Sequence, residues 1–204
     1  MKNRLWLVVA GAVALVIVAP LVWFLASPLF INNVVEEEFP AQIPSAAELV
    51  QMPEEKRQAL EVELVETAAK MPDKLMDEPM PETVSDTQPV LVGQGQFKDA
   101  DSFHQGSGQA ALYQLADGSY VLRFEEFSVT NGPDLHVILS SHPAPASSQE
   151  VMQGYLDLGS LKGNIGSQNY TLPAGTDVSQ FKSVVIYCQP FQVVFATALL
   201  SNNQ

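Results

Sequence analysis

The chain has 204 residues, of which 23 are acidic and 10 are basic, so its formal net charge is −13 at pH 7. This charge argues against nucleic acid as a partner and against attraction to anionic lipid headgroups. Cys188 is the only cysteine, which excludes a disulfide within the chain.

An apolar run lies near the N-terminus. Residues 5–35 contain no charge and residues 5–26 are almost entirely apolar, which is long enough to cross a bilayer as one helix. Lys2 and Arg4 precede the run and three glutamates follow it, a bias that keeps the N-terminus in the cytoplasm and exports the rest. We expect residues 1–35 to form an uncleaved single-pass anchor. A cleaved signal peptide is the alternative, although the run is longer than a usual signal core and A-S-P is a poor cleavage site.

Residues 36–89 have the composition of an acidic, proline-rich spacer. They hold fourteen acidic and four basic residues, which does not favour a packed core. Leu60, Leu64 and Ala68 recur at helical spacing after Pro53, and this predicts one helix within the spacer. We interpret it as a solvated helix that lifts the next domain off the membrane. A helix that binds a partner or oligomerises is the alternative.

Residues 90–204 predict an all-β domain. Short runs rich in Val, Leu, Ile, Phe and Tyr alternate with turn signals, the pattern of a small antiparallel β-sandwich or barrel. Asp117-Gly118 between ALYQLA and SYVLRF is the clearest hairpin signal, because both residues tolerate a positive φ. About 115 residues suffice for one core. The sequence thus predicts an all-β domain carried by an N-terminal transmembrane helix and a partly helical spacer.

Cys188 ends the run SVVIYC. Side chains alternate along a strand, so Val184, Ile186 and Cys188 share one face and Val185 and Tyr187 share the other. On this reading Cys188 points into the core, where a thiol has a raised pKa and is inert. The run is followed closely by a proline, which marks a strand end, so a thiol that opens to a pocket remains the alternative.

Several blocks of residues 93–200 resemble the electron-transfer DM-thirteen domain. The blocks occur in order, without large gaps, and the match covers almost the whole β domain. They are G-Q-F with the following histidine and S-G (Gly95 to Gly108), F-E-E-F and N-G-P-D-L (Phe124 to Leu135), L-G-S-L-K-G-N-I-G-S-Q-N-Y (Leu158 to Tyr170), P-A-G-T-D (Pro173 to Asp177) and S-V-V-I-Y-C-Q-P-F (Ser183 to Phe191).

The resemblance implies a small β domain, often exported or tethered, whose cysteine does redox work as a free thiol or by holding a prosthetic group such as haem. It assigns this role to Cys188 and, more loosely, to His104. A haem held by these two residues would be non-covalent, because no C-x-x-C-H motif occurs. The resemblance implies no substrate.

The residues themselves give limited support for a metal or haem. His104 lies in a Gly-Ser loop, DSFHQGSG, where a histidine is exposed unless something binds it. His136 is out of phase with Leu135 and Val137, and we expect it among polar neighbours or in solvent. His142 lies in a loop before a proline. No H-x-H, C-x-x-C or clustered carboxylate pattern predicts a structural metal site.

Hydrolase and phosphate-binding motifs are absent from the sequence. There is no G-x-S-x-G, candidate Ser, His and Asp residues are scattered, and the G-x-G stretches do not open helices. Two hypotheses remain, and the sequence does not decide whether the chain is an enzyme. The first is a membrane-tethered extracytoplasmic redox or electron-transfer module centred on Cys188, with a protein partner outside the cytoplasm. The second is a tethered β-sandwich that binds a partner or ligand without chemistry.

Overall fold

The computed structural model describes residues 46–81 and 88–202. The helices are α2 (Ala46–Gln51), α3 (Glu54–Ala68) and α4 (Ser148–Val151), with a 3-10 turn at Val178–Gln180. The strands are β1 (Leu75–Asp77), β2 (Val90–Asp99), β3 (Gly106–Gln114), β4 (Tyr120–Val129), β5 (Leu135–Ser140), β6 (Tyr155–Ser160), β7 (Ile165–Thr171), β8 (Ser183–Cys188), β9 (Val193–Leu199) and β10 (Ser201–Asn202). Within these ranges no helix is both long and apolar enough to cross a membrane. The expected anchor, residues 5–26, lies outside the described residues.

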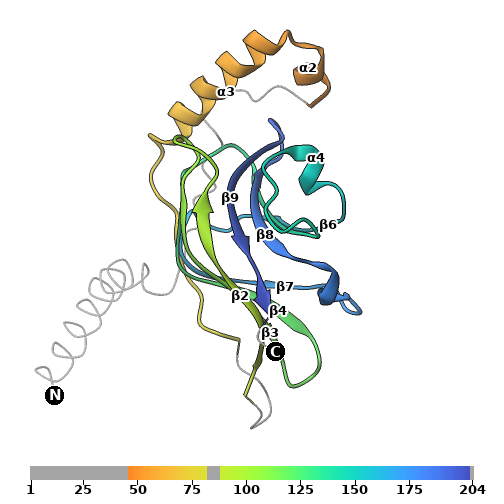
Figure 1. The fold of residues 1–204 in the computed structure, drawn as a ribbon. Helices are drawn as coiled ribbons and strands as arrows, with labels where there is room; N and C mark the ends of the chain where they lie inside the picture. The colour runs from red at the N-terminus through yellow and green to blue at the C-terminus, as the bar shows by residue number, and fades with distance from the viewer. Residues whose placement is uncertain (1–45, 82–87, 203–204) are drawn as a thin grey trace, which may run out of the picture. The chain divides into compact units, whose positions relative to one another are not determined.

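The described strands form one curled sheet, a half-barrel, in the order β1-β7-β4-β3-β2-β9-β8-β5-β6, with β10 paired to β2 (Figure 1). The predicted β class is therefore confirmed. The strand β2 connects the two halves of the sheet, because its first part pairs with β3 and its last part, Phe97 to Asp99, pairs with β9. The predicted hairpin around Asp117-Gly118 joins β3 to β4, and Gly118 has a φ of 83°.

The main core fills the concave side of the sheet. It holds the aromatic side chains Phe97, Phe124, Phe127 and Phe195 together with aliphatic residues from most strands. A smaller cluster lies on the other face of β5, β8 and β9, where Val151 of α4 covers Ile138, Val185, Tyr187 and Val194. Because both faces of β8 are covered, every residue of this strand is buried.

The helix α3 packs on the sheet. It lies across one end of the curled sheet in Figure 1, and its buried residues Leu64 and Val65 belong to the main core. Leu60 packs partly buried against the same core. The apolar positions that predicted the helix thus face the β domain, so α3 is docked where the sequence suggested a solvated spacer. The physical reason is that the end of a half-barrel exposes core side chains, which an apolar helix face removes from water.

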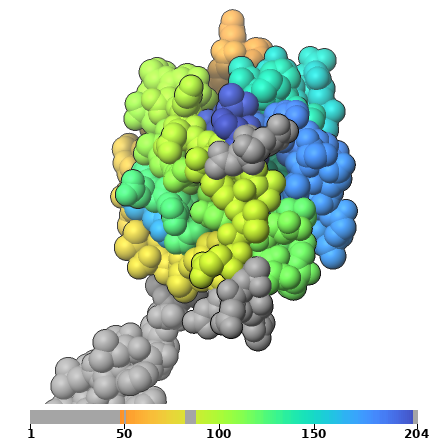
Figure 2. Space-filling model, turned by 60° about the horizontal axis from the view of Figure 1, so that its bottom comes forward, coloured from red at the N-terminus to blue at the C-terminus, as the bar shows by residue number. Residues whose placement is uncertain are grey.

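The segment after α3 also belongs to the sheet. The strand β1 pairs in parallel with β7, Leu75 beside Ile165, and Figure 2 shows this part of the chain, in yellow, directly against the strands. Glu78 accepts hydrogen bonds from Lys162 Nζ at 2.8 Å and from the backbone N–H of Asn169 at 2.7 Å. Part of the expected spacer therefore supplies an edge strand. The domain boundary expected at residue 90 stays a prediction.

Candidate functional site

Cys188 lies at the C-terminal end of β8 and is 1 % exposed. It belongs to the main core together with Val184 and Ile186, whereas Val185 and Tyr187 belong to the smaller cluster on the other face. The alternation predicted from SVVIYC is therefore observed, and the side chain of Cys188 points into the concave side of the sheet.

The thiol of Cys188 is held in its protonated form. Its Sγ donates a hydrogen bond to the backbone oxygen of Pro133 at 3.1 Å. Burial raises the pKa of Cys188 to about 12, the backbone N–H of Phe191 opposes the shift, and the negative charges of Glu61 and Asp134 add to it. Because the thiolate is the nucleophilic form, Cys188 is unreactive as a nucleophile near pH 7 in this arrangement.

His104 is buried although it lies in the loop between β2 and β3, at 7 % exposure. Asp101 builds this loop, because its Oδ1 accepts the backbone N–H groups of Phe103 and His104 at 2.7 and 2.8 Å. The other carboxylate oxygen lies 2.7 Å from His104 Nδ1. The imidazole also packs on Phe195, with 4.3 Å between the ring centroids. The expectation of an exposed loop histidine fails because this Asp-turn folds the ring inward.

Glu61 of α3 lies opposite the second imidazole nitrogen. Its Oε1 is 4.0 Å from His104 Nε2, which is buried and has no hydrogen-bond partner among the described residues. Burial raises the pKa of Glu61, while the charges of His104 and Arg57 oppose the shift. Glu61 also contributes to the raised pKa of Cys188. Its carboxylate therefore acts on both residues that the sequence singled out.

Sequence reasoning missed Glu61 because it placed the helix in solvent. A signal was present in the helical spacing, since Glu61 is followed at three, four and seven positions by Leu64, Val65 and Ala68, which places it on the same face of the helix. A lone acidic residue on an apolar helix face indicates a buried carboxylate with a specific neighbour. The neighbour itself comes from a loop 43 residues further along the chain and could not be identified from spacing.

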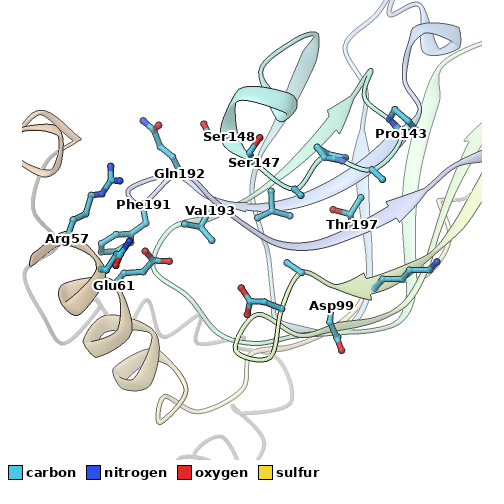
Figure 3. A pocket seen from close by; sticks show the side chains of 18 of the residues that line it. Arg57, Glu61, Asp99, Pro143, Ser147, Ser148, Phe191, Gln192, Val193 and Thr197 are labelled. Atoms are coloured by element: carbon cyan, nitrogen blue, oxygen red, sulfur yellow. The ribbon is translucent and has the colours of Figure 1, made fainter. Parts of the chain in front are cut away.

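Two cavities flank α3. One, of about 580 Å³, lies between α3, the β8–β9 turn and the loop before α4; Figure 3 shows Arg57 and Glu61 on the helix beside Phe191 and Gln192 of the turn. The other, of about 500 Å³, lies between α3 and the His104 loop. Glu61 and Gln58 line both cavities, whereas Cys188 lines neither.

Cys188 and His104 do not fit a haem iron in this arrangement. An iron ligand needs an electron pair directed into an open site, but the sulfur of Cys188 is enclosed by the core and its hydrogen is directed to Pro133 O. His104 Nε2 faces the Glu61 carboxylate. In the part of the chain that the structure describes, no three His, Cys, Asp or Glu side chains are grouped to hold a metal ion.

The other histidines have local partners. His136 Nδ1 lies 2.9 Å from Asp157 Oδ2 and its Nε2 lies 3.3 Å from Asp134 Oδ1, as expected for a histidine among polar neighbours. Ser160 Oγ is 3.5 Å from the same Nε2, so the sheet brings a serine, a histidine and an aspartate together. Asp134 Oδ1 lies closer to this Nε2 than Ser160 Oγ does, so the geometry does not pair the serine with a free base. His142 Nδ1 accepts the backbone N–H of Ala144 at 3.2 Å.

A buried thiol at the helix-covered end of a curled sheet defines this as a β-rich module with one candidate redox group. Comparison with protein families gives the more specific assignment. The family model described as Electron transfer DM13 matches residues 96–200, about half of the chain, and the chain belongs to this family. Searches of curated proteins and of solved structures found no match. Membership in this family indicates a redox-related role in general terms.

Proposed function

We propose that this chain is a redox module tethered to a membrane by residues 5–26, with residues 36–204 outside the cytoplasm and Cys188 as its reacting group. The redox role follows from the family. The tether and the orientation rest on the apolar run and on the charges that flank it. The module would exchange electrons with a protein partner on the outer side.

The observation that carries the assignment to Cys188 is that it shares the main core with α3. The main core that holds Cys188 also holds Leu64 and Val65 of this helix, and the charge of Glu61 reaches the thiol. With α3 docked, the thiol is shielded and neutral at pH 7. We infer that an oxidant reaches Cys188 when α3 leaves the sheet, because removing the helix exposes this end of the core and admits water, which lowers the pKa of the thiol.

The experiment follows oxidation of the thiol in the full chain. Hydrogen peroxide converts a thiol to a sulfenic acid with release of water, and dimedone traps that product for mass spectrometry. Leu64→Ala removes a buried contact of α3, and Leu172→Ala is the matched control, because Leu172 is equally buried but its backbone N–H bonds to Tyr120, at the start of β4. We expect Leu64→Ala to raise the trapping rate at least about tenfold over wild type and Leu172→Ala to raise it less.

Cys188→Ala gives no trapped product and sets the background. If both leucine variants accelerate trapping equally, global unfolding exposes the thiol and the role of α3 is wrong. If no native variant is trapped while the denatured wild type is, Cys188 is a packing residue.

The non-catalytic binding module remains a second candidate, and two observations favour it. The thiol is buried with a pKa of about 12, and two cavities large enough for a small ligand flank α3. The peroxide experiment separates the two functions, since a binding module needs no accessible thiol.

A further inference from the structure

We propose that the cavity between α3 and the His104 loop binds a small aromatic molecule that carries a hydroxyl group, of the phenol or hydroquinone class. The hydroxyl bridges His104 Nε2 and the Glu61 carboxylate. This site goes beyond the redox role of Cys188 and does not depend on it, because Cys188 does not line the cavity.

The cavity has the character of a small-molecule site. Its volume is about 500 Å³, and its walls include the apolar side chains of Val62 and Val65 on α3, of Ala69 directly after it and of Phe103 on the loop. Val62 and Phe103 are exposed. Small-ligand sites are typically apolar cavities of this size with a few converging polar groups. Here the converging groups are Glu61 and His104.

The hydrogen-bonding state of His104 indicates what the ligand must offer. The hydrogen bonds from His104 and Phe103 outweigh the effect of burial and lower the pKa of Asp101, so Asp101 is a carboxylate that can only accept. His104 Nδ1 therefore carries a proton and donates to Asp101. In the neutral imidazole Nε2 is then an acceptor, and it faces a second acceptor, Glu61.

A hydroxyl gives this pair a partner in either protonation state of His104, and it bridges both groups when the imidazole is charged. When the imidazole is neutral, a hydroxyl donates to Nε2 or to the carboxylate. When the imidazole is charged, the hydroxyl oxygen accepts from Nε2–H and its hydrogen goes to Glu61. The direct distance of 4.0 Å is too long for a hydrogen bond between the two side chains. Glu61 has a long, flexible side chain, and a small rotation makes room for a bridging oxygen.

The class of the ligand follows from the rest of the lining. A quinone or another carbonyl compound has no donor, so it accepts from Nε2 only when the imidazole is charged and offers nothing to Glu61 in either state. An ammonium group would pair with Glu61 and Glu66, which both line the cavity, but His104 repels it when the imidazole is charged. A phenolic hydroxyl is neutral at pH 7, and its ring matches the apolar walls and can pack on Phe103. A phenol or hydroquinone therefore fits both parts of the site.

The test uses two probes of similar size and the full chain in lipid nanodiscs, with empty nanodiscs as reference. 4-Methoxyphenol carries one hydroxyl, and 1,4-dimethoxybenzene carries none. We expect calorimetry to show binding of 4-methoxyphenol at least about tenfold tighter than that of the dimethoxy compound, because only the first bridges His104 Nε2 and the Glu61 carboxylate. In methyl NMR, Val62 and Val65 should shift on binding and Val151, in the cluster beneath α4, should not.

Matched variants locate the site. Val62→Trp fills the cavity and should abolish binding, whereas Val90→Trp, at an exposed valine outside the cavity, should not. Glu61→Gln provides an amide that can donate to Nε2 itself and should weaken binding at least about fivefold. Glu63→Gln, on the same helix but outside the cavity, should leave binding unchanged.

Equal affinity for the two probes, no binding of either, or methyl shifts outside the cavity would each overturn the proposal; in those cases a water molecule or a direct side-chain contact satisfies His104. Cys188→Ala separates this site from the redox role. It should bind 4-methoxyphenol as the wild type does, even if it loses the peroxide-dependent product.

Discussion

At the scale of single residues, burial shifts the pKa values of two acidic groups in the same direction. It raises the pKa of the Cys188 thiol and of the Glu61 carboxyl, so burial penalises the charged form of both. The charges of His104 and Arg57 oppose the shift of Glu61, whereas the Cys188 thiol donates to a carbonyl.

The raised pKa of Cys188 predicts a loss of stability at alkaline pH. The thiol has a pKa of about 12 in the folded chain, against 9.0 for an unperturbed thiol. Above pH 9 the unfolded chain releases this proton and the folded chain keeps it, so the free energy of unfolding falls as pH rises toward 12. The contribution of this one group is at most about 1.4 kcal/mol per pH unit. Cys188→Ala should remove it, so urea unfolding between pH 8 and pH 11 should show a shallower decline for the variant.

Val184→Ala is the control for this measurement, because it shortens a buried side chain on the same face of β8 without removing an ionisable group. Tyr170 and Tyr187 also have raised pKa values because of burial, and their contribution remains in all three chains. Parallel curves for wild type and Cys188→Ala would mean that the thiol ionises as readily in the folded chain as in the unfolded one.

At the scale of elements, β1 depends on a glycine in its partner strand. Gly166 of β7 has a φ of 99°, and a Cβ at this position would collide with the backbone oxygen of Met76 in β1. The absence of a side chain therefore lets the two backbones approach. Gly159 has nearly the same φ, 96°, but nothing lies where its Cβ would be.

This pair of glycines gives a matched prediction. Both Gly166→Ala and Gly159→Ala should lose about 1–2 kcal/mol through the left-handed backbone. Gly166→Ala should lose at least about 1 kcal/mol more, because it also separates β1 from β7. Chemical unfolding gives the difference, and hydrogen exchange should show faster exchange of the β1 amides in Gly166→Ala only. Equal losses would mean that β1 contributes little to the stability of the sheet.

At the scale of the whole molecule, the sequence predicted the β class and the face of Cys188, because alternation within one strand is a local property. It did not predict that α3 docks on the sheet, since this requires knowing which end of the half-barrel is open. His104 was expected at the surface because its loop looked polar, yet Asp101 three residues earlier turns the ring inward. The contact between Glu61 and His104 joins two segments that lie far apart in the chain, so no spacing pattern in the sequence predicts it.

The orientation of the chain is testable as a whole. We expect a C-terminal fusion to alkaline phosphatase, which is active only after export, to be active, and a fusion to a fluorescent protein that folds only in the cytoplasm to be dark. The reason is the placement of Lys2 and Arg4 before the apolar run. Replacing both residues by glutamate should reduce phosphatase activity. A bright cytoplasmic fusion together with an inactive phosphatase would contradict the proposed topology.

The parallel pairing of β1 with β7 has a consequence for synthesis of the chain. Leu75 meets Ile165, and Asn164 Nδ2 donates to Asp73 Oδ1 across 91 positions. The ribosome therefore synthesises β1 long before its partner strand β7. The strands β8 and β9, which complete the core under the apolar face of α3, are synthesised later still. Because such distant pairings form slowly, the nascent chain has unpaired segments until nearly all of it has been made, and during this interval we expect a chaperone to be needed most.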